Sequence, residues 1–485
     1  MMDKVKRKIY SIPISARVSA IYMICSVLQR GISFIVVPIY TRLVPSGEYG
    51  LYSLYQSWAM IVTLFATLNM WNYVYNNGMI RFENSKDEFT SALIGLSGVI
   101  SMGFFSIIFI FREKFCELSG LSLYLLILMF LEIFFRPAFE YWYARQRFEY
   151  QLKKYVIVSL LISITQPVLC ISFVKLSKRI QDGITGYALI TGKVVCVLIV
   201  YFFIFCVLIR KCCKLYNKEI WKFALRFNVP LIPHFLAGII LQHSDRIMIS
   251  KMCDVSSVAV YSIAYNAGMI LYFVNEALIN VIIPWTYKKM KKFDYQGFTE
   301  SAILIIGLIS IINIMLSICA PEIISIMAPK EYYNAIYIIP PVAISCVYMC
   351  LFNLYANIEY YYEETKLVAV ASTLSAVLNI FLNYIFIKKF GYIAAGYTTV
   401  VCYICYAAFH LLFMKYVLKK NSVKSNIYNN VVLWVEAIAA TIISIGVVVL
   451  YPYPIIRYCL LLFVSIIVIL YRNKIMEKLK MYKTN

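Results

Sequence analysis

The sequence predicts an all-α polytopic membrane protein with about 14 transmembrane helices. Three observations lead to this fold class: 62% of the 485 residues are hydrophobic, only 14% are charged, and long apolar stretches recur along the whole chain. Because soluble globular domains carry about 25% charged residues, this chain lacks the charge to cover a water-facing surface. A water-soluble enzyme and a disordered protein are therefore excluded.

The apolar stretches have the length that a bilayer crossing requires, about 20 residues. They must be helices, because lipid offers no hydrogen-bond partner to an open strand edge or a loop. The ten-residue alternation of a transmembrane β-barrel is absent. In chain order, the predicted spans are 14–40, 50–75, 89–111, 120–141, 155–174, 184–209, 227–250, 257–285, 300–320, 335–358, 366–387, 391–414, 430–450 and 453–471.

The net charge of +22 comes from 46 Lys and Arg against 24 Asp and Glu. If the N-terminus is cytoplasmic, 30 of these 46 cations fall in cytoplasmic segments and 11 in the loops on the opposite side. This bias follows the positive-inside rule and predicts that both termini are cytoplasmic. The basic surplus therefore sets orientation and attracts anionic membrane lipids, and nucleic-acid binding is not expected.

The chain also contains an internal repeat. A shift of 209 residues places the first two predicted spans on the seventh and eighth, so that Tyr52-Ser53 coincides with Tyr261-Ser262. Gly186-Tyr187 matches Gly396-Tyr397 at a shift of 210. Since six helices are an even number, the two halves have the same orientation, related by a pseudo-twofold axis along the membrane normal. Transporters with this design hold their substrate site at the repeat interface.

The repeat predicts three parts. Residues 1–215 form an N-terminal lobe with helices 1–6, and residues 216–425 form a C-terminal lobe with helices 7–12. Residues 426–485 add helices 13 and 14 and a basic cytoplasmic tail.

Several motifs resemble a known family in order and spacing. The segment Pro38–Gly50 resembles the entry signature of bacterial polysaccharide-biosynthesis membrane proteins, the Wzx-type lipid-linked oligosaccharide flippases of the multidrug/oligosaccharidyl-lipid/polysaccharide (MOP) exporter superfamily. The second half carries further matches of the same kind: Pro230–His234, Ser244–Ser250, Val260–Tyr265, Pro284-Trp285 and Gly391–Gly396.

The resemblance implies a two-lobe, MATE-like transporter of the bacterial inner membrane and no enzyme activity. Its relatives move undecaprenyl-diphosphate-linked oligosaccharide units from the cytoplasmic to the outer leaflet, for O-antigen, capsule or another surface polysaccharide. Its partners would be this lipid-linked substrate, membrane lipids, and the polymerase and glycosyltransferases of the same pathway. Neither the sugar unit nor the coupling ion follows from the resemblance.

Cations at membrane depth are the candidate contacts of a diphosphate headgroup. Each ionisable group costs about 2.5–3.5 kcal/mol at the centre of a span, and arginine offers a planar fork that suits phosphate. An alternative for each is a structural ion pair, or a position at the membrane rim. The candidates are Arg30, Arg136, Arg246, Arg81 and Lys193.

Four other groups are candidate cation or proton sites. Glu132, Arg136 and Glu140 are spaced by four residues, which places them on one stripe of a helix. These side chains either line a cavity or form ion pairs with one another within the helix. Asp245 and Glu276 either couple transport to a cation or form ion pairs, and His243 is either a proton site or a structural histidine. The coupling candidates are Glu132, Asp245, Glu276 and His243.

The motifs of ATP hydrolysis and metal binding are absent. The chain has no Walker sequence and no HExxH, and its three histidines are far apart, so no cofactor and no metal are expected. Two alternatives to a flippase remain. One is a multidrug or cation antiporter of the same superfamily, and the other is a membrane polysaccharide polymerase, which would need catalytic groups on a large external loop.

Overall fold

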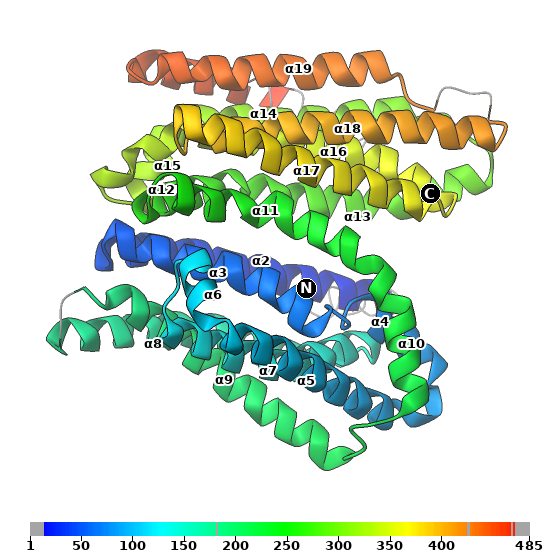
Figure 1. Cartoon of the computed structure of the whole chain (residues 1–485). Coiled ribbons are helices and arrows are strands. Elements are labelled where there is room, and N and C mark those ends of the chain that lie inside the picture. Colours follow the sequence, from blue (N-terminus) through cyan, green and yellow to red (C-terminus); the bar gives the residue numbers. More distant parts are fainter. Residues whose placement is uncertain (1–13, 181–182, 424–426, 467–468, 471–485) are drawn as a thin grey trace, which may run out of the picture. The chain divides into compact units, whose positions relative to one another are not determined.

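A computed structural model describes residues 14–180, 183–423, 427–466 and 469–470. Throughout these ranges the regular secondary structure is helical, as the composition predicts. The α-helices are α2 (Ile14–Leu43), α3 (Ser46–Thr67), α4 (Tyr73–Arg81), α5 (Lys86–Ile110), α6 (Arg112–Ser119), α7 (Leu123–Phe148), α8 (Leu152–Ile180), α9 (Thr185–Lys211), α10 (Lys218–Asn228), α11 (Ile232–Met252), α12 (Val255–Gly268), α13 (Ile270–Lys291), α14 (Phe298–Ile318), α15 (Ala320–Met327), α16 (Ile339–Tyr361), α17 (Thr365–Phe390), α18 (Ala394–Lys420) and α19 (Asn430–Gly446) (Figure 1).

Eleven helical stretches within the described ranges are long and apolar enough to cross a membrane, or twelve if the bent pair α6–α7 is one span. The protein is therefore a multi-pass membrane protein, although the predicted number of fourteen is not confirmed. The stretch predicted at 50–75 forms α3, which is not one of the eleven stretches that are long and apolar enough to cross a membrane. The last predicted span is represented by a shorter apolar helix, Pro454–Ile466, and part of it lies beyond the described residues.

The chain divides into two compact units between Leu236 and Ala237. The helix ends repeat with the offset that the sequence predicts: α2 and α11 end 209 residues apart, and α3 and α12 begin 209 residues apart. Both ends of α9 and α18 are also separated by 209 residues, one fewer than the shift of 210 that matches Gly186-Tyr187 to Gly396-Tyr397. The predicted boundaries at 215 and 425 remain a proposal, and α19 packs against α14 and α16 inside the second unit.

The first unit is built on the neighbouring helices α3, α5, α7, α8 and α9 (Figure 1). Its core contains the rings of Tyr75 and Tyr141, stacked at 5.2 Å, together with the buried Phe89. The Ser122 hydroxyl accepts a hydrogen bond from the Leu125 amide and starts α7, as expected of a serine N-cap.

The second unit surrounds α16, which is almost entirely buried. Helices α14, α17, α18 and α19 pack around it (Figure 1). Apolar side chains such as Val347 and Leu351 fill this core. Asp254 caps α12 by accepting from the Ser257 amide at 2.8 Å. The completeness of its burial makes α16 the central element of this unit, so any polar group on its inner faces has only protein neighbours.

Candidate functional site

The first unit contains a buried ion pair. The ammonium of Lys193 on α9 lies 3.0 Å from Glu132 on α7, and their side chains are 13% and 6% exposed. The Tyr55 hydroxyl on α3 donates to the second carboxylate oxygen at 3.0 Å, and Lys193 lies over the Tyr55 ring. Lys193, a candidate contact of the substrate, and Glu132, a candidate coupling acid, therefore neutralise each other. Helices α3, α7 and α9 meet at the Glu132 carboxylate.

Arg136 lies one helical turn after Glu132. Its Nε donates to Glu140 at 3.1 Å, and its guanidinium lies 5.8 Å from the centre of the Trp71 ring. The Arg136 side chain is 22% exposed, and no hydrogen bond to its two Nη groups occurs among the described residues. The members of the predicted stripe therefore have different partners. Glu132 binds Lys193, whereas Arg136 binds Glu140 through Nε and leaves its two Nη groups available.

Arg30 and Arg81 are both exposed. Arg30 lies on α2, and Arg81 is the last residue of α4. Arg81 makes an open ion pair with Glu219 at 3.5 Å and lies over the Phe223 ring. Both cations therefore lie at the surface of the first unit.

The second unit contains a buried carboxylate, Asp245 on α11, whose side chain has no exposed surface. Its oxygens accept hydrogen bonds from groups on three other helices. The Tyr261 hydroxyl on α12 donates to Oδ2, the Asn383 amide on α17 donates to Oδ1 at 2.6 Å, and the Thr399 hydroxyl on α18 donates to Oδ2 at 3.2 Å. Asp245 is thus the centre at which four helices of this unit are joined.

Asn379 extends this group, which we call the Asp245 cluster: Asp245, Tyr261, Asn379, Asn383, Thr398 and Thr399. The Asn379 amide approaches Asp245 at 3.4 Å, and its oxygen accepts from Ser244 at 2.8 Å. Thr398 donates to the Asn383 oxygen. Carboxylate, amide and hydroxyl oxygens therefore face one another among buried side chains.

Arg246, next to Asp245 in the sequence, makes separate contacts. Its Nε donates to the Ser262 hydroxyl at 3.0 Å, and one Nη donates to the Gln242 carbonyl at 2.8 Å. The guanidinium lies 4.5 Å from the centre of the Tyr265 ring, and the residue is 6% exposed. Binding a headgroup would therefore require Arg246 to exchange these partners.

The two remaining candidates are half-buried. Nδ1 of His243 is buried and has no hydrogen-bond partner among the described residues. Glu276 on α13 forms no ion pair within the described ranges. No group of three or more His, Cys, Asp or Glu side chains in those ranges has an arrangement that could hold a metal.

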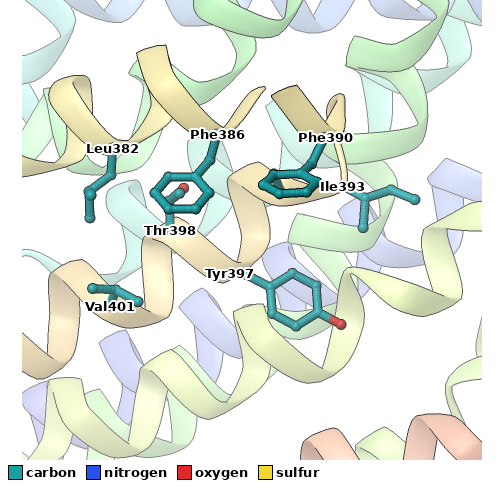
Figure 2. A pocket seen from close by; sticks show the side chains of 8 residues that line it. Leu382, Phe386, Phe390, Ile393, Tyr397, Thr398 and Val401 are labelled. Carbon is teal, nitrogen blue, oxygen red and sulfur yellow. The ribbon is translucent and has the colours of Figure 1, made fainter. Parts of the chain in front are cut away.

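An apolar pocket adjoins the Asp245 cluster. Figure 2 shows Phe386 and Phe390 of α17 above Tyr397, Thr398 and Val401 of α18. Thr398 belongs to both the pocket and the cluster. A molecule in this pocket would contact one of the side chains that hold Asn383.

Sequence reasoning identified Asp245 but not its partners. Asn379 and Asn383 lie four residues apart on an otherwise apolar helix, and Ser372 and Ser375 extend the same buried side toward the start of α17. A polar stripe with this period in a transmembrane helix is the signal that would have found them.

Comparison with known proteins adds a family. Residues 15–290, more than half of the chain, match the family model described as "Polysaccharide biosynthesis protein". The chain belongs to this family. The chain is also similar to a putative protein of the Lsg locus of Haemophilus influenzae, with 23% identity over 158 residues, which are 32% of this chain and 39% of that protein. The match thus spans about two fifths of the relative's length.

Solved structures establish the fold. A lipid II flippase MurJ in an inward closed conformation matches 93% of this chain and 99% of its own, with a TM-score of 0.72 and 17% identity. An inward-facing multidrug resistance MATE transporter of the MOP superfamily matches 82% of this chain and 96% of its own, with a TM-score of 0.59 and 15% identity. The protein therefore has the fold of MOP transporters, as its motifs predict.

Proposed function

We propose that the protein flips undecaprenyl-diphosphate-linked oligosaccharide units from the cytoplasmic to the outer leaflet of the bacterial inner membrane by alternating access. The observation that carries this proposal is the near full-length likeness to a lipid II flippase, in a chain whose family serves polysaccharide biosynthesis. The product would be an O-antigen, a capsule or another surface polysaccharide. Polymerase and glycosyltransferases of the same pathway would be its partners, and the protein itself performs no covalent chemistry.

The diphosphate would be bound by arginines. Arg136 supports this role because it is partly exposed and only its Nε is engaged. Arg30 and Arg81 are exposed cations. Arg246 and Lys193 are held by buried partners, which they would have to leave in order to bind the headgroup. Guanidinium groups bind phosphate oxygens through two parallel hydrogen bonds, so Arg30, Arg136 and Arg246 are the proposed headgroup contacts, with Arg81 and Lys193 in supporting roles.

The Asp245 cluster is the proposed site of the coupling cation. A single carboxylate surrounded by amide and hydroxyl oxygens can hold a proton or a small hard cation, whose preferred ligands are oxygens. Glu132, Glu276 and His243 are further candidates. Binding a cation at Asp245 would change the hydrogen bonds of α12, α17 and α18 together.

The test uses the purified protein in proteoliposomes that contain undecaprenyl-diphosphate-linked oligosaccharide. A membrane-impermeant glycosidase reports which leaflet holds the sugar. Wild-type protein should move it, and the double variant Arg30→Ala with Arg136→Ala should slow movement by more than tenfold. Arg112→Ala with Lys330→Ala, a matched loss of two exposed cations, should retain the rate.

Two results would contradict these assignments. An inactive wild-type protein argues against the flippase function, and normal transport by both Arg30→Ala and Arg246→Ala argues against the headgroup contacts. The likeness to a multidrug transporter supports the alternative of a drug or cation antiporter. Drug susceptibility of a pump-deficient host expressing the protein distinguishes the two functions. Polymerised sugar in the proteoliposomes would support the third alternative, a membrane polymerase.

A further inference from the structure

The second unit contains a buried acid–base pair that belongs to none of the groups described above. His410 on α18 and Glu359 on α16 are both fully buried, and His410 Nδ1 lies 2.8 Å from Glu359 Oε1. The two residues are 51 positions apart in the chain. They meet because α16 and α18 pack against each other along their lengths.

Each partner of this pair keeps one polar atom without a hydrogen bond. His410 Nε2 and Glu359 Oε2 are buried and have no partner among the described residues. Aromatic rings enclose the imidazole: Phe352 stacks at 5.5 Å and Tyr406 at 4.8 Å between ring centres. Replacing a buried ion pair by apolar residues of similar volume often leaves a protein as stable as before or makes it more stable. A contribution to the stability of the fold therefore does not account for this arrangement.

The surroundings do not compensate a charge on the pair. Tyr406 on α18 packs against His410, and Tyr360 on α16 and the Ser372 hydroxyl on α17 lie beside Tyr406. No lysine, arginine or aspartate of α13, α14 or α19 forms an ion pair with Glu359 or His410 within the described ranges. The charge of the pair is therefore determined by its own protons.

Counting those protons distinguishes two states. A neutral histidine with an ionised glutamate carries one negative charge. One added proton, on the imidazole or on the carboxylate, makes the pair neutral overall. A net charge in an apolar, water-free interior is strongly unfavourable, so the protonated pair suits the buried arrangement. Loss of the proton requires a conformation in which water reaches the pair.

We infer that the His410–Glu359 pair is a proton-binding site that takes up one proton from water and returns it to water during transport, separately from the Asp245 cluster. The inference rests on the proposed transport function, because only a protein that changes conformation exposes this pair. Hydronium gives its proton to Nε2 or Oε2 and leaves as water, and on release a water molecule accepts the proton to form hydronium again. No other bond is changed.

Histidine-selective ¹⁵N NMR of the full chain in nanodiscs tests proton binding without substrate. The chain has only three histidines, and loss of one signal in His410→Asn assigns His410. We expect the His410 signal to shift between pH 5 and 9. The proton concentration at the midpoint of this shift should change at least tenfold in Glu359→Gln. His234→Asn, which alters a histidine outside the pair, should leave the midpoint unchanged.

The flipping rate in proteoliposomes provides the second readout. Wild-type flipping should depend on pH across the His410 midpoint, and Glu359→Gln should reduce that dependence at least fivefold. A His410 signal that does not respond to pH, or a Glu359→Gln midpoint equal to that of the wild type, overturns the inference. Because the NMR titration uses no lipid-linked sugar, a titrating pair in a protein that moves no oligosaccharide supports the site and contradicts the flippase function. If Glu359→Gln does not fold, the wild-type titration decides.

Discussion

Lys193 and Glu132 join α9 to α7 in a place that is almost free of solvent. We expect Lys193→Met and Glu132→Gln each to destabilise the protein by about 3–5 kcal/mol, because each leaves a charge buried without its partner. The double variant removes both charges and should be more stable than either single variant. Thermal unfolding of the purified proteins in detergent measures this cycle.

The exposed pair Arg81–Glu219 is the control for that cycle, since its side chains are 56% and 70% exposed. Exposed ion pairs contribute about 0–1 kcal/mol, so Arg81→Ala should change stability little. Additive losses in the Glu132–Lys193 double variant would show that the two charges act independently, contrary to their geometry.

The sequence predicts single charged residues better than their partners. Glu132, Lys193 and Asp245 are recognisable because each is an ionisable residue in an apolar stretch. Their partners cannot be recognised in the sequence, because Lys193 lies 61 residues from Glu132 and Asn383 lies 138 residues from Asp245. His410 and Glu359 were missed for the same reason, since only helix packing brings them together. The spacing of Glu132, Arg136 and Glu140 suggests ion pairs within α7. Arg136 does pair with Glu140, but Glu132 pairs with Lys193 on α9.

At the scale of elements, α3 and α9 lie close together at Gly186. A Cβ there would lie 2.7 Å from the Glu48 carbonyl oxygen and 2.9 Å from its Cβ, and the Gly186 amide donates to the Glu48 carboxylate. Gly186→Ala should therefore force the helices apart, at a cost of about 1–3 kcal/mol or more. Unfolding temperature is the measurement.

Two other glycines provide graded controls for Gly186→Ala. A Cβ at Gly396, which matches Gly186 at a shift of 210 residues, would lie 3.2 Å from the Ile338 side chain and 3.3 Å from the Pro341 ring. One at Gly31 would meet nothing within 4 Å. Gly396→Ala should thus cost less than Gly186→Ala. Gly31→Ala should be neutral or stabilising by up to about 1 kcal/mol, because alanine favours helix. Equal losses at all three sites would contradict the proposed steric cause.

The apolar helix Pro454–Ile466 is joined to α15 by a carboxylate. Arg457 donates two hydrogen bonds to Glu322, both of 2.8 Å. Burial raises the pKa of Glu322, but the hydrogen bonds from Arg457 outweigh it and hold the pKa below its usual value. A depressed carboxyl pKa stabilises the fold above the pKa of the unfolded chain, and this contribution is lost as the pH falls through the folded pKa.

Thermal unfolding across pH checks this ion pair. Wild-type protein should exceed Glu322→Gln in unfolding temperature at pH 7, and the difference should shrink as the pH falls below the usual carboxyl range near 4. A difference that is constant with pH would mean that the glutamate acts through shape rather than charge.

Helix positions follow from hydropathy, whereas the breaks between helices do not. The predicted span 50–75 is interrupted after α3 by Leu68 and Asn69, which have φ of 54° and 48°, although neither proline nor glycine marks the place. The predicted span 257–285 contains the boundary between α12 and α13 at Met269, directly after Gly268. Tertiary packing sets these breaks, because the apolar composition is continuous across them.

For the whole molecule, the distribution of Lys and Arg predicts orientation. With the N-terminus in the cytoplasm, green fluorescent protein fused after residue 294 or 363 should fluoresce, and alkaline phosphatase fused after residue 329 or 391 should be active. The physical reason is that basic loops remain on the cytoplasmic side. The opposite pattern of activities would reject this topology and the proposed cytoplasmic termini with it.

The repeat gives both units the same helix offsets, yet their buried carboxylates are electrically different. Lys193 balances Glu132 in the first unit, so this pair carries no net charge on which a membrane voltage could act. Asp245 accepts hydrogen bonds from neutral hydroxyl and amide donors, and binding of the proposed monovalent cation would change the charge of its site by one unit. Moving one charge through the whole field is worth about 2.3 kcal/mol per 100 mV. Voltage would therefore bias the second unit through Asp245 and leave the Glu132–Lys193 pair of the first unaffected.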